Sequence, residues 1–250
     1  MCCFSRPVIS VSQTNIFARS TMQGHQLLVY SMNLNAKEDL AMILPIPVKP
    51  HSGEKAVHFI NLEKYPNFFK DMQQGFIVQE YTLSKSMKGR MAMGAGSVLE
   101  VLEVGSFQAS FVPTLKDFSR LDARFRLPAG TWEQLPQYKE FGFAVFKLKP
   151  GAKTIHPMAF EFPRADPHHL FFPTVHIHDG KVHATAMFDH SLFYQRMHGE
   201  TFSLATWKES ASLAKTFMKV EKTAGMVLGD NHCYRMMITG RKANRDFVVG

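Results

Sequence analysis

The chain has 250 residues, of which 45% are hydrophobic and 20% charged, a composition typical of a globular protein. Its net charge of +8 is spread along the sequence, without the recurrent basic and aromatic pattern of a nucleic-acid-binding module. No apolar run approaches the roughly 18 residues that span a bilayer. We therefore expect neither a membrane nor a nucleic acid as partner, while a protein partner stays open.

The cysteines are too few for a disulfide framework, because only Cys2, Cys3 and Cys233 are present. Neighbouring Cα atoms lie about 3.8 Å apart, below the usual disulfide range of about 4.4–6.8 Å, so Cys2 and Cys3 are not expected to pair. The N-terminus also lacks the apolar segment of a signal peptide. Free thiols without an export signal predict a cytoplasmic protein.

Prolines and glycines punctuate the first half at short intervals, which indicates short strands and turns. The predicted strands are Pro7–Val11, Asn15–Ser20, Gln26–Leu34, Asp39–Pro45 and Ala56–Asn61. Prolines cannot donate hydrogen bonds to a ladder, so Pro45 and Pro47 predict that the fourth strand leaves the sheet or lies at its edge.

A helix is expected after Pro66, because Phe68, Phe69 and Met72 fall on neighbouring helical positions before a glycine stop at Gly75. Five further segments complete the middle of the chain. They are a loop at Met87–Gly96, a strand at Val98–Val112 with a turn or bulge at Gly105-Ser106, a short helix at Thr114–Leu121, and strands at Phe141–Leu148 and Met158–Phe162.

A late helix is predicted from Thr206 to near Gly225. The segment Thr206-Trp207-Lys208-Glu209 has the form of a capping box. An apolar stripe follows at spacings of three and four, formed by Trp207, Ala211, Ala214 and Met218. A last strand, Cys233–Thr239, is predicted to bury Cys233 in the core.

These elements predict a strand-rich α+β protein with mostly antiparallel sheets and two or three helices. The sequence shows no internal repeat and no flexible linker, which favours a single domain of residues 1–250. Two pseudo-halves, of about residues 1–112 and 113–250, remain the alternative.

The most informative stretch for function is a predicted β-hairpin that runs through Thr174–Ala184. Asp179-Gly180 between two alternating segments is a strong hairpin signal, because both loop positions of a type I′ turn need positive φ. With these two residues in the loop, His176 faces His183, and period two places His178 on the same face as both.

That face predicts a transition-metal site formed by His176, His178 and His183. Opposed residues have Cβ atoms about 4.5–5.5 Å apart, within reach of two imidazoles that bind one ion. Three neutral imidazoles suit zinc, copper, iron or nickel, and three ligands with an open fourth position are typical of a catalytic metal. Asp189 is a further candidate on this face. The alternative is an ordinary polar strand face, which the neighbouring Lys181 favours.

Cys2 is a second candidate for chemistry. If the initiator Met is removed, its thiol lies beside an α-amine of pKa about 7.7–8.0, and such an amine can act as the base for an N-terminal nucleophile. The alternative is that Cys2 and Cys3 are small residues that lead into the first strand. Whether the protein is an enzyme therefore stays open.

No nucleotide cofactor is expected, because the sequence holds no P-loop, no G-x-G-x-x-G, no G-x-S-x-G and no H-E-x-x-H motif.

The order of several motifs resembles a bacterial family of unknown function. The segment Leu40–Pro47 resembles the aliphatic-Pro-x-Pro segment of that family, and Tyr138 followed by Gly142-Phe143 resembles its Tyr-x3-Gly-aromatic strand. The continuation through Pro157–Phe160 to Phe172-Pro173 is also similar. The resemblance implies a shared strand-rich fold, and it assigns no catalytic residue.

Three functions follow from the sequence. The first is a transition-metal-binding protein, as a metalloenzyme or not, that uses the histidine hairpin. The second is a protein-interaction or scaffold domain without catalysis. The third is hydrolase-type chemistry at Cys2.

Overall fold

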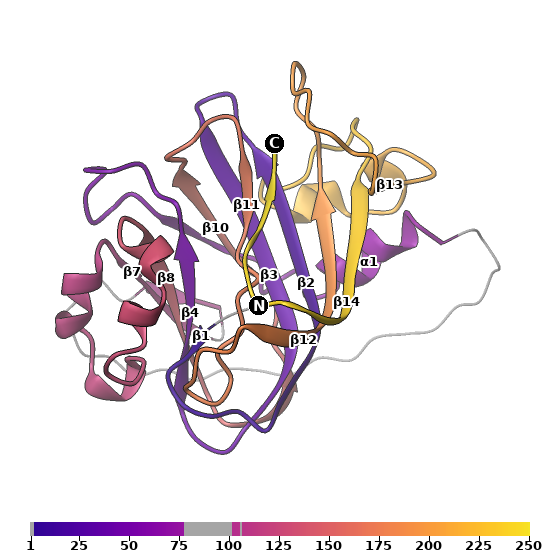
Figure 1. Cartoon of the computed structure of the whole chain (residues 1–250). Helices are drawn as coiled ribbons and strands as arrows, with labels where there is room; N and C mark the ends of the chain where they lie inside the picture. The colour runs from indigo at the N-terminus through magenta and orange to yellow at the C-terminus, as the bar shows by residue number, and fades with distance from the viewer. Residues whose placement is uncertain (1–2, 78–101, 106) are drawn as a thin grey trace.

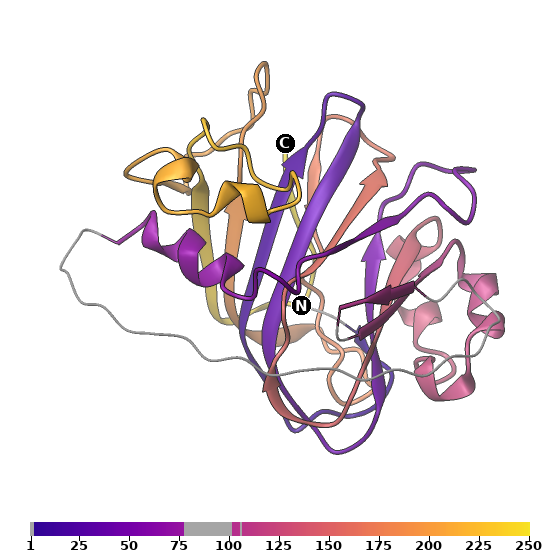
Figure 2. The ribbon, with the colours of Figure 1, turned by 180° about the vertical axis from the view of Figure 1, so that it is seen from behind.

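The computed structural model describes residues 3–77, 102–105 and 107–250. These residues form two main β-sheets and a two-stranded ribbon, and nearly all neighbouring strands are antiparallel. Figures 1 and 2 show the sheets side by side, with helical segments on their outer faces. The predicted strand-rich α+β class is confirmed.

The larger sheet has the order β13-β14-β12-β2-β3-β10-β5, and β9 also pairs with β3. Only the β12–β2 pair is parallel among these neighbours. The strands are β2 (Ser10–Ser20), β3 (His25–Ala36), β5 (His58–Asn61), β9 (Gly151–Thr154), β10 (Met158–Pro163), β12 (Thr185–Tyr194), β13 (Lys208–Glu209) and β14 (Tyr234–Ala243).

The smaller sheet has the order β1-β4-β8-β7-β6, and the ribbon pairs β11 with β15. Their strands are β1 (Cys3–Phe4), β4 (Leu40–Ile46), β6 (Leu102–Val104), β7 (Phe107–Val112), β8 (Gly142–Leu148), β11 (Leu170–Phe172) and β15 (Phe247–Val249). β1 pairs only with Met42 and Ile43 of β4. Pro45 therefore lies on a part of β4 that β1 does not pair with.

The helical segments cover the outer faces of the two sheets. One α-helix, α1 (Phe68–Gln74), confirms the helix predicted before Gly75. The 3-10 helices are η1 (Leu115–Arg120), η2 (Ala123–Phe125), η3 (Trp132–Gln134), η4 (Pro136–Tyr138), η5 (Ala214–Thr216) and η6 (Val220–Lys222). None of the helices in the described ranges has the length and apolar character needed to cross a membrane.

The central core lies between the sheets, and each sheet has a second apolar layer on its other face. In β10, Phe160 belongs to the central core, whereas its neighbour Ala159 faces the layer under α1. In β8, Phe146 faces the central core and Phe143 faces the layer under η1–η4. Because side chains alternate between faces, a strand covered on both sides reads as a continuous apolar run.

The predicted helix from Thr206 to Gly225 is wrong. Its place is taken by β13, η5 and η6. The apolar residues that looked like one stripe are divided between two cores, because Trp207 packs in the central core and Ala214 and Met218 pack in the layer under α1. A single helix cannot present one face to two separate layers.

Of the other predicted segments, the loop Met87–Gly96 lies outside the described residues, as does the beginning of the strand at Val98. The rest of that strand is found as β6 and β7, with a turn at Gly105. The short helix predicted at Thr114–Leu121 is found as η1.

Candidate functional site

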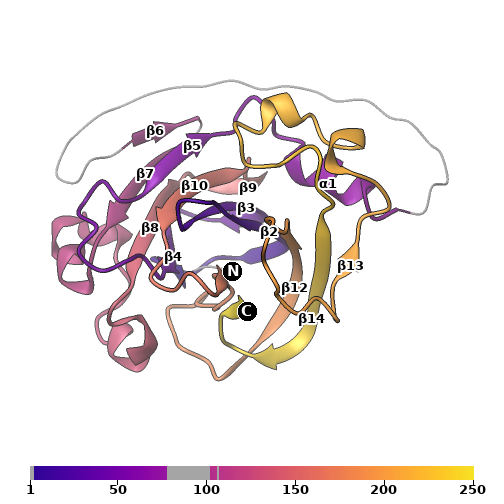
Figure 3. The same ribbon diagram turned by 90° about the horizontal axis from the view of Figure 1, so that it is seen from above.

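The histidine-bearing segment Thr174–Ala184 does not form the predicted hairpin. Ile177 instead makes a parallel bridge with Cys3 of β1. The N–H of Phe4 donates to the carbonyl oxygen of Ile177 at 3.0 Å, and the N–H of Val8 donates to that of His178 at 3.0 Å. The segment therefore pairs with the beginning of the chain rather than with its own continuation. Figure 3 looks onto the curved large sheet, in which β12 lies between β2 and β14.

Side chains near the end of the chain hold the other side of the segment. The Asn244 oxygen accepts the N–H of His176 at 2.7 Å, and its amide nitrogen donates to the carbonyl oxygens of His176 and His183, both at 2.9 Å. This one amide thus takes the place of a neighbouring strand.

Asp246 holds the residues just before the histidines. One carboxylate oxygen accepts the N–H groups of Thr174 and Val175, at 2.7 and 3.0 Å. The other accepts the hydroxyl of Tyr138 at 2.5 Å. Burial raises the pKa of the Asp246 carboxyl, although the hydrogen bonds from these donors lower it. The segment therefore connects the first strand, η4 and the end of the chain.

The structure brings together two of the three predicted ligands and adds a histidine that the sequence did not single out. The ring centroids of His176 and His178 lie 5.1 Å apart, and the ring of His190 in β12 lies 5.2 Å from His176. Phe188 completes this histidine layer, 4.2 Å from His176. Strand alternation in β12, which turns Phe188, His190 and Leu192 inward, was the available signal for His190.

His183 lies apart from this layer, so the predicted set of His176, His178 and His183 is not assembled. Its side chain is exposed, and its Nε2 atom lies 2.9 Å from a carboxylate oxygen of Asp179. Asp189 also has another role, because it accepts the N–H of Gln13 at a bulge of β2. Among the described residues, no group of three or more His, Cys, Asp or Glu side chains is placed to hold a metal ion.

The histidine layer is neutral at physiological pH. Burial is the main cause that lowers the pKa of His176 to about 2 and that of His178 to about 4, and it lowers the pKa of His190 as well. His190 is fully buried, and no described residue hydrogen-bonds to either of its ring nitrogens or to Nε2 of His176. The three imidazoles serve as packed rings that resist protonation.

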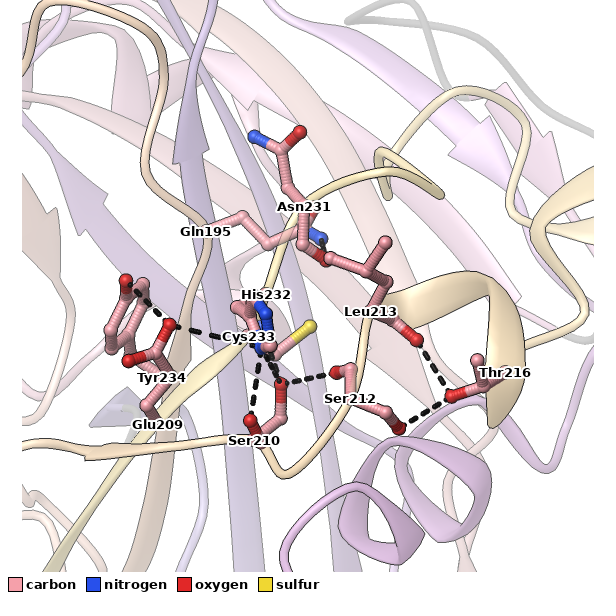
Figure 4. Close-up of polar contacts among 10 residues, drawn as sticks. All are labelled: Gln195, Glu209, Ser210, Ser212, Leu213, Thr216, Asn231, His232, Cys233 and Tyr234. Carbon is pink, nitrogen blue, oxygen red and sulfur yellow. Dashed lines mark hydrogen bonds and ion pairs between the residues drawn. The ribbon is translucent and has the colours of Figure 1, made fainter.

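A second polar cluster, shown in Figure 4, joins β13 to β14 and has the residue types of a nucleophile–base–acid group. The Nδ1 atom of His232 lies 3.3 Å from the Ser210 hydroxyl and 3.7 Å from a carboxylate oxygen of Glu209. A serine relay needs the hydroxyl and the acid on opposite ring nitrogens. Here both approach the same nitrogen, so the arrangement does not activate Ser210.

The remaining bonds of this cluster show a structural role. The Ser210 hydroxyl donates to the carbonyl oxygen of Ser212 at 2.8 Å and accepts the N–H of Cys233 at 3.0 Å. Burial raises the pKa of the Cys233 thiol to about 12, which favours the protonated thiol over the thiolate. The prediction that Cys233 packs in the core is confirmed.

Cys2 lies outside the described residues, and its proposed chemistry stays a prediction. Its neighbour Cys3 is fully buried in β1.

Comparisons with solved structures match this chain to baculovirus P35. No family model matches the chain, so the resemblance to a bacterial family stays a prediction. The crystal structure of baculovirus P35 matches with a TM-score of 0.52 at 15% identity, over 100% of this chain and 99% of that one. The caspase-8/P35 complex matches at a TM-score of 0.49 and 13% identity, over 96% of each chain. A mutated P35 after caspase cleavage matches at 0.48 and 14%, over 96% and 99%. The first of these likenesses shows that this chain has the fold of baculovirus P35.

Proposed function

We propose that this chain is a protein-binding protein whose partner is a protease of the caspase class. The observation that carries the proposal is the likeness of fold to baculovirus P35 across nearly all of both chains. The solved structures of P35 include a complex with caspase-8 and a form that a caspase has cleaved. At 15% identity the likeness concerns the fold, and the partner is our proposal.

The polar clusters of the described residues support a binding role over catalysis. Ser210 and Glu209 meet the same nitrogen of His232, and Cys233 is held as a buried thiol. The histidine layer consists of neutral, packed rings. Asn244 and Asp246 fix the end of the chain to the core by side-chain hydrogen bonds. Such a scaffold suits a protein that must keep its shape while a protease is bound to it.

The test is a titration of active caspase-8 with the purified chain, followed by hydrolysis of a fluorogenic peptide substrate. We expect activity to fall as the chain is added and to reach its minimum near equimolar amounts. Heat-denatured chain is the control for simple substrate competition, and a papain-type cysteine protease is the control for class. Undiminished caspase activity at a tenfold excess of folded chain would contradict the proposal.

The Cys2 hypothesis can be separated from this one in the same assay. The Cys2→Ser variant and the original chain are compared in a screen of ester and amide substrates. Equal hydrolysis rates of the two proteins for every substrate would contradict N-terminal nucleophile chemistry at Cys2. The caspase titration does not depend on that result.

A further inference from the structure

β14 is the outer strand of the large sheet over most of its length. β12 pairs with all of it on one side, from Tyr234 to Ala243. On the other side, β13 pairs only with Tyr234 and Arg235. Figure 1 shows β14 at the margin of the sheet, with the short β13 beyond one end. Residues 236–243 therefore have no strand on their outer side within the described part of the chain.

The hydrogen-bonding groups on this outer side can be assigned from the ladder. The N–H of Ser210 donates to the carbonyl oxygen of Cys233 at 2.8 Å, so the backbone of Cys233 points toward β13. Residues of an antiparallel strand alternate in direction. The N–H and C=O groups of Met237, Thr239 and Arg241 therefore point outward as well. No backbone group in the described ranges bonds to them, and such a row is a template for another strand.

An apolar groove lies along this edge. Its volume is about 380 Å³, and it lies between β14 and the segment that leads into β15. The inward-facing side chains of β14 and the neighbouring strands line it, namely Phe188, Met236, Ile238 and Phe247. A strand added to β14 would alternate in the same way, so every second side chain would point into this groove.

The rim of the groove is basic. Lys242 and Arg245 line it. Both are exposed, and neither forms an ion pair with a described residue. The acidic residue nearby, Asp246, already accepts hydrogen bonds from Tyr138, Thr174 and Val175. Unpaired cations at one end of an apolar groove are complementary to carboxylates of a bound chain.

We propose that the free edge of β14 binds an extended peptide segment of a partner protein by strand addition, and that this segment carries apolar side chains on its groove face and acidic side chains at the end beside Lys242 and Arg245. Its backbone pairs with Met237, Thr239 and Arg241. Its apolar side chains enter the groove over Ile238 and Phe247, and its carboxylates pair with Lys242 and Arg245. This surface is distinct from the caspase-binding role proposed above and does not depend on it.

The sharpest variant is Thr239→Pro. The N–H of Thr239 points outward, so proline removes one donor from the free edge and none from the ladder with β12. The probe is a short fluorescein-labelled peptide in which Val and Thr alternate in the centre and Glu residues stand at both ends, and binding is read by fluorescence anisotropy. We expect binding to the original chain and a loss of about tenfold or more in affinity for Thr239→Pro, because a strand-addition complex depends on its main-chain hydrogen bonds.

Two controls keep the test independent of folding. A peptide with N-methyl groups on the bonds that face β14 removes the same hydrogen bonds while the original chain is used. The variant Lys242→Glu should weaken binding of the acidic peptide, whereas Lys116→Glu, the same charge change on η1, should not.

Several outcomes would overturn the proposal. They are equal binding of the same peptide with Lys in place of Glu, undiminished binding to Thr239→Pro or of the N-methyl peptide, and no binding of the acidic peptide up to millimolar concentration. A dimer of the original chain, seen by light scattering, that Thr239→Pro converts to a monomer would also overturn it, because the edge would then bind a second copy of the chain.

Discussion

His190 and His176 are buried histidines that make the folded structure sensitive to acid. Both side chains are buried, with exposed fractions of 0% and 6%, and burial lowers the pKa of each. In the unfolded chain a histidine binds its proton near pH 6.5. Below that pH the unfolded state therefore holds protons that the folded state excludes. The part of the unfolding free energy that depends on these two histidines is therefore fully present above about pH 6.5, and it is lost as the pH falls below that value.

Replacement of His190 should reduce this acid sensitivity. Each buried histidine contributes up to about 1.4 kcal/mol of lost stability per pH unit below 6.5. In His190→Leu we expect the fall in unfolding free energy between pH 6.5 and 5 to be smaller by about 2 kcal/mol, as measured by urea unfolding. The matched control is His183→Leu, at an exposed histidine of the same segment. An unchanged pH slope in His190→Leu would show that the acid response arises elsewhere.

Asn244 is the second critical residue, because its side chain makes three hydrogen bonds to the backbone of the histidine segment. Asn244→Ala leaves these backbone groups without their partner. We expect a loss of about 2–3 kcal/mol in unfolding free energy, measured by chemical denaturation. Asn67→Ala is the control, because Asn67 is exposed and makes no capping bond to α1. Similar stabilities of the two variants would refute the role of Asn244.

At the scale of elements, the contact between α1 and the segment around η5 is tight. Gly75 ends α1 with a φ of −62°, so its backbone is not strained. A Cβ at this position would lie 2.6 Å from the ring of Phe217. Gly75 is therefore required for close packing rather than for its conformational freedom.

Gly75→Ala should displace the ring of Phe217 and cost about 1–3 kcal/mol of stability. In the double variant Gly75→Ala/Phe217→Leu the smaller leucine leaves room for the new methyl group. The double variant should therefore lose less stability than the sum of the two single variants, as measured by thermal unfolding of all three proteins. Gly229→Ala is the control, because a Cβ there would make only ordinary contacts from 3.4 Å. Additive effects at Gly75 and Phe217 would contradict this packing.

The elements that sequence reasoning predicted well are those with a local pattern. Gln26–Leu34 lies within β3, Phe141–Leu148 matches β8, and Phe68, Phe69 and Met72 are the buried face of α1. The failures involve partners that are distant in sequence. Asp179-Gly180 has the residues of a hairpin turn, yet β1 and Asn244 take both sides of the segment before it. No periodicity within residues 174–184 carries information about Cys3 or Asn244.

The candidate site shows the same limit. The rings of His176 and His178 lie next to each other, as their spacing of two residues on one extended segment predicts. The ring of His190 contacts that of His176 because β12 packs against this segment. The side chain of His183 lies apart from them and contacts the carboxylate of Asp179 instead. The charges on Lys242 and Arg245 were visible in the sequence, whereas the groove beside them depends on the position of β15.

At the scale of the whole molecule, two sheets share one core, and each carries a second apolar layer on its outer face. This double coverage explains why β4 is buried along its whole length. The parallel pair of β2 and β12 joins residues about 175 positions apart, which no local pattern can indicate. At 15% identity, the likeness to baculovirus P35 is a property of this arrangement rather than of shared motifs.

The direct test of the proposed function is whether the chain and caspase-8 form a complex. Equimolar chain and active caspase-8 should be mixed and separated by size-exclusion chromatography with light scattering. We expect the two proteins to elute together, at a mass equal to their sum. Separate elution at concentrations of tens of micromolar, with caspase activity unchanged, would contradict a caspase-binding role.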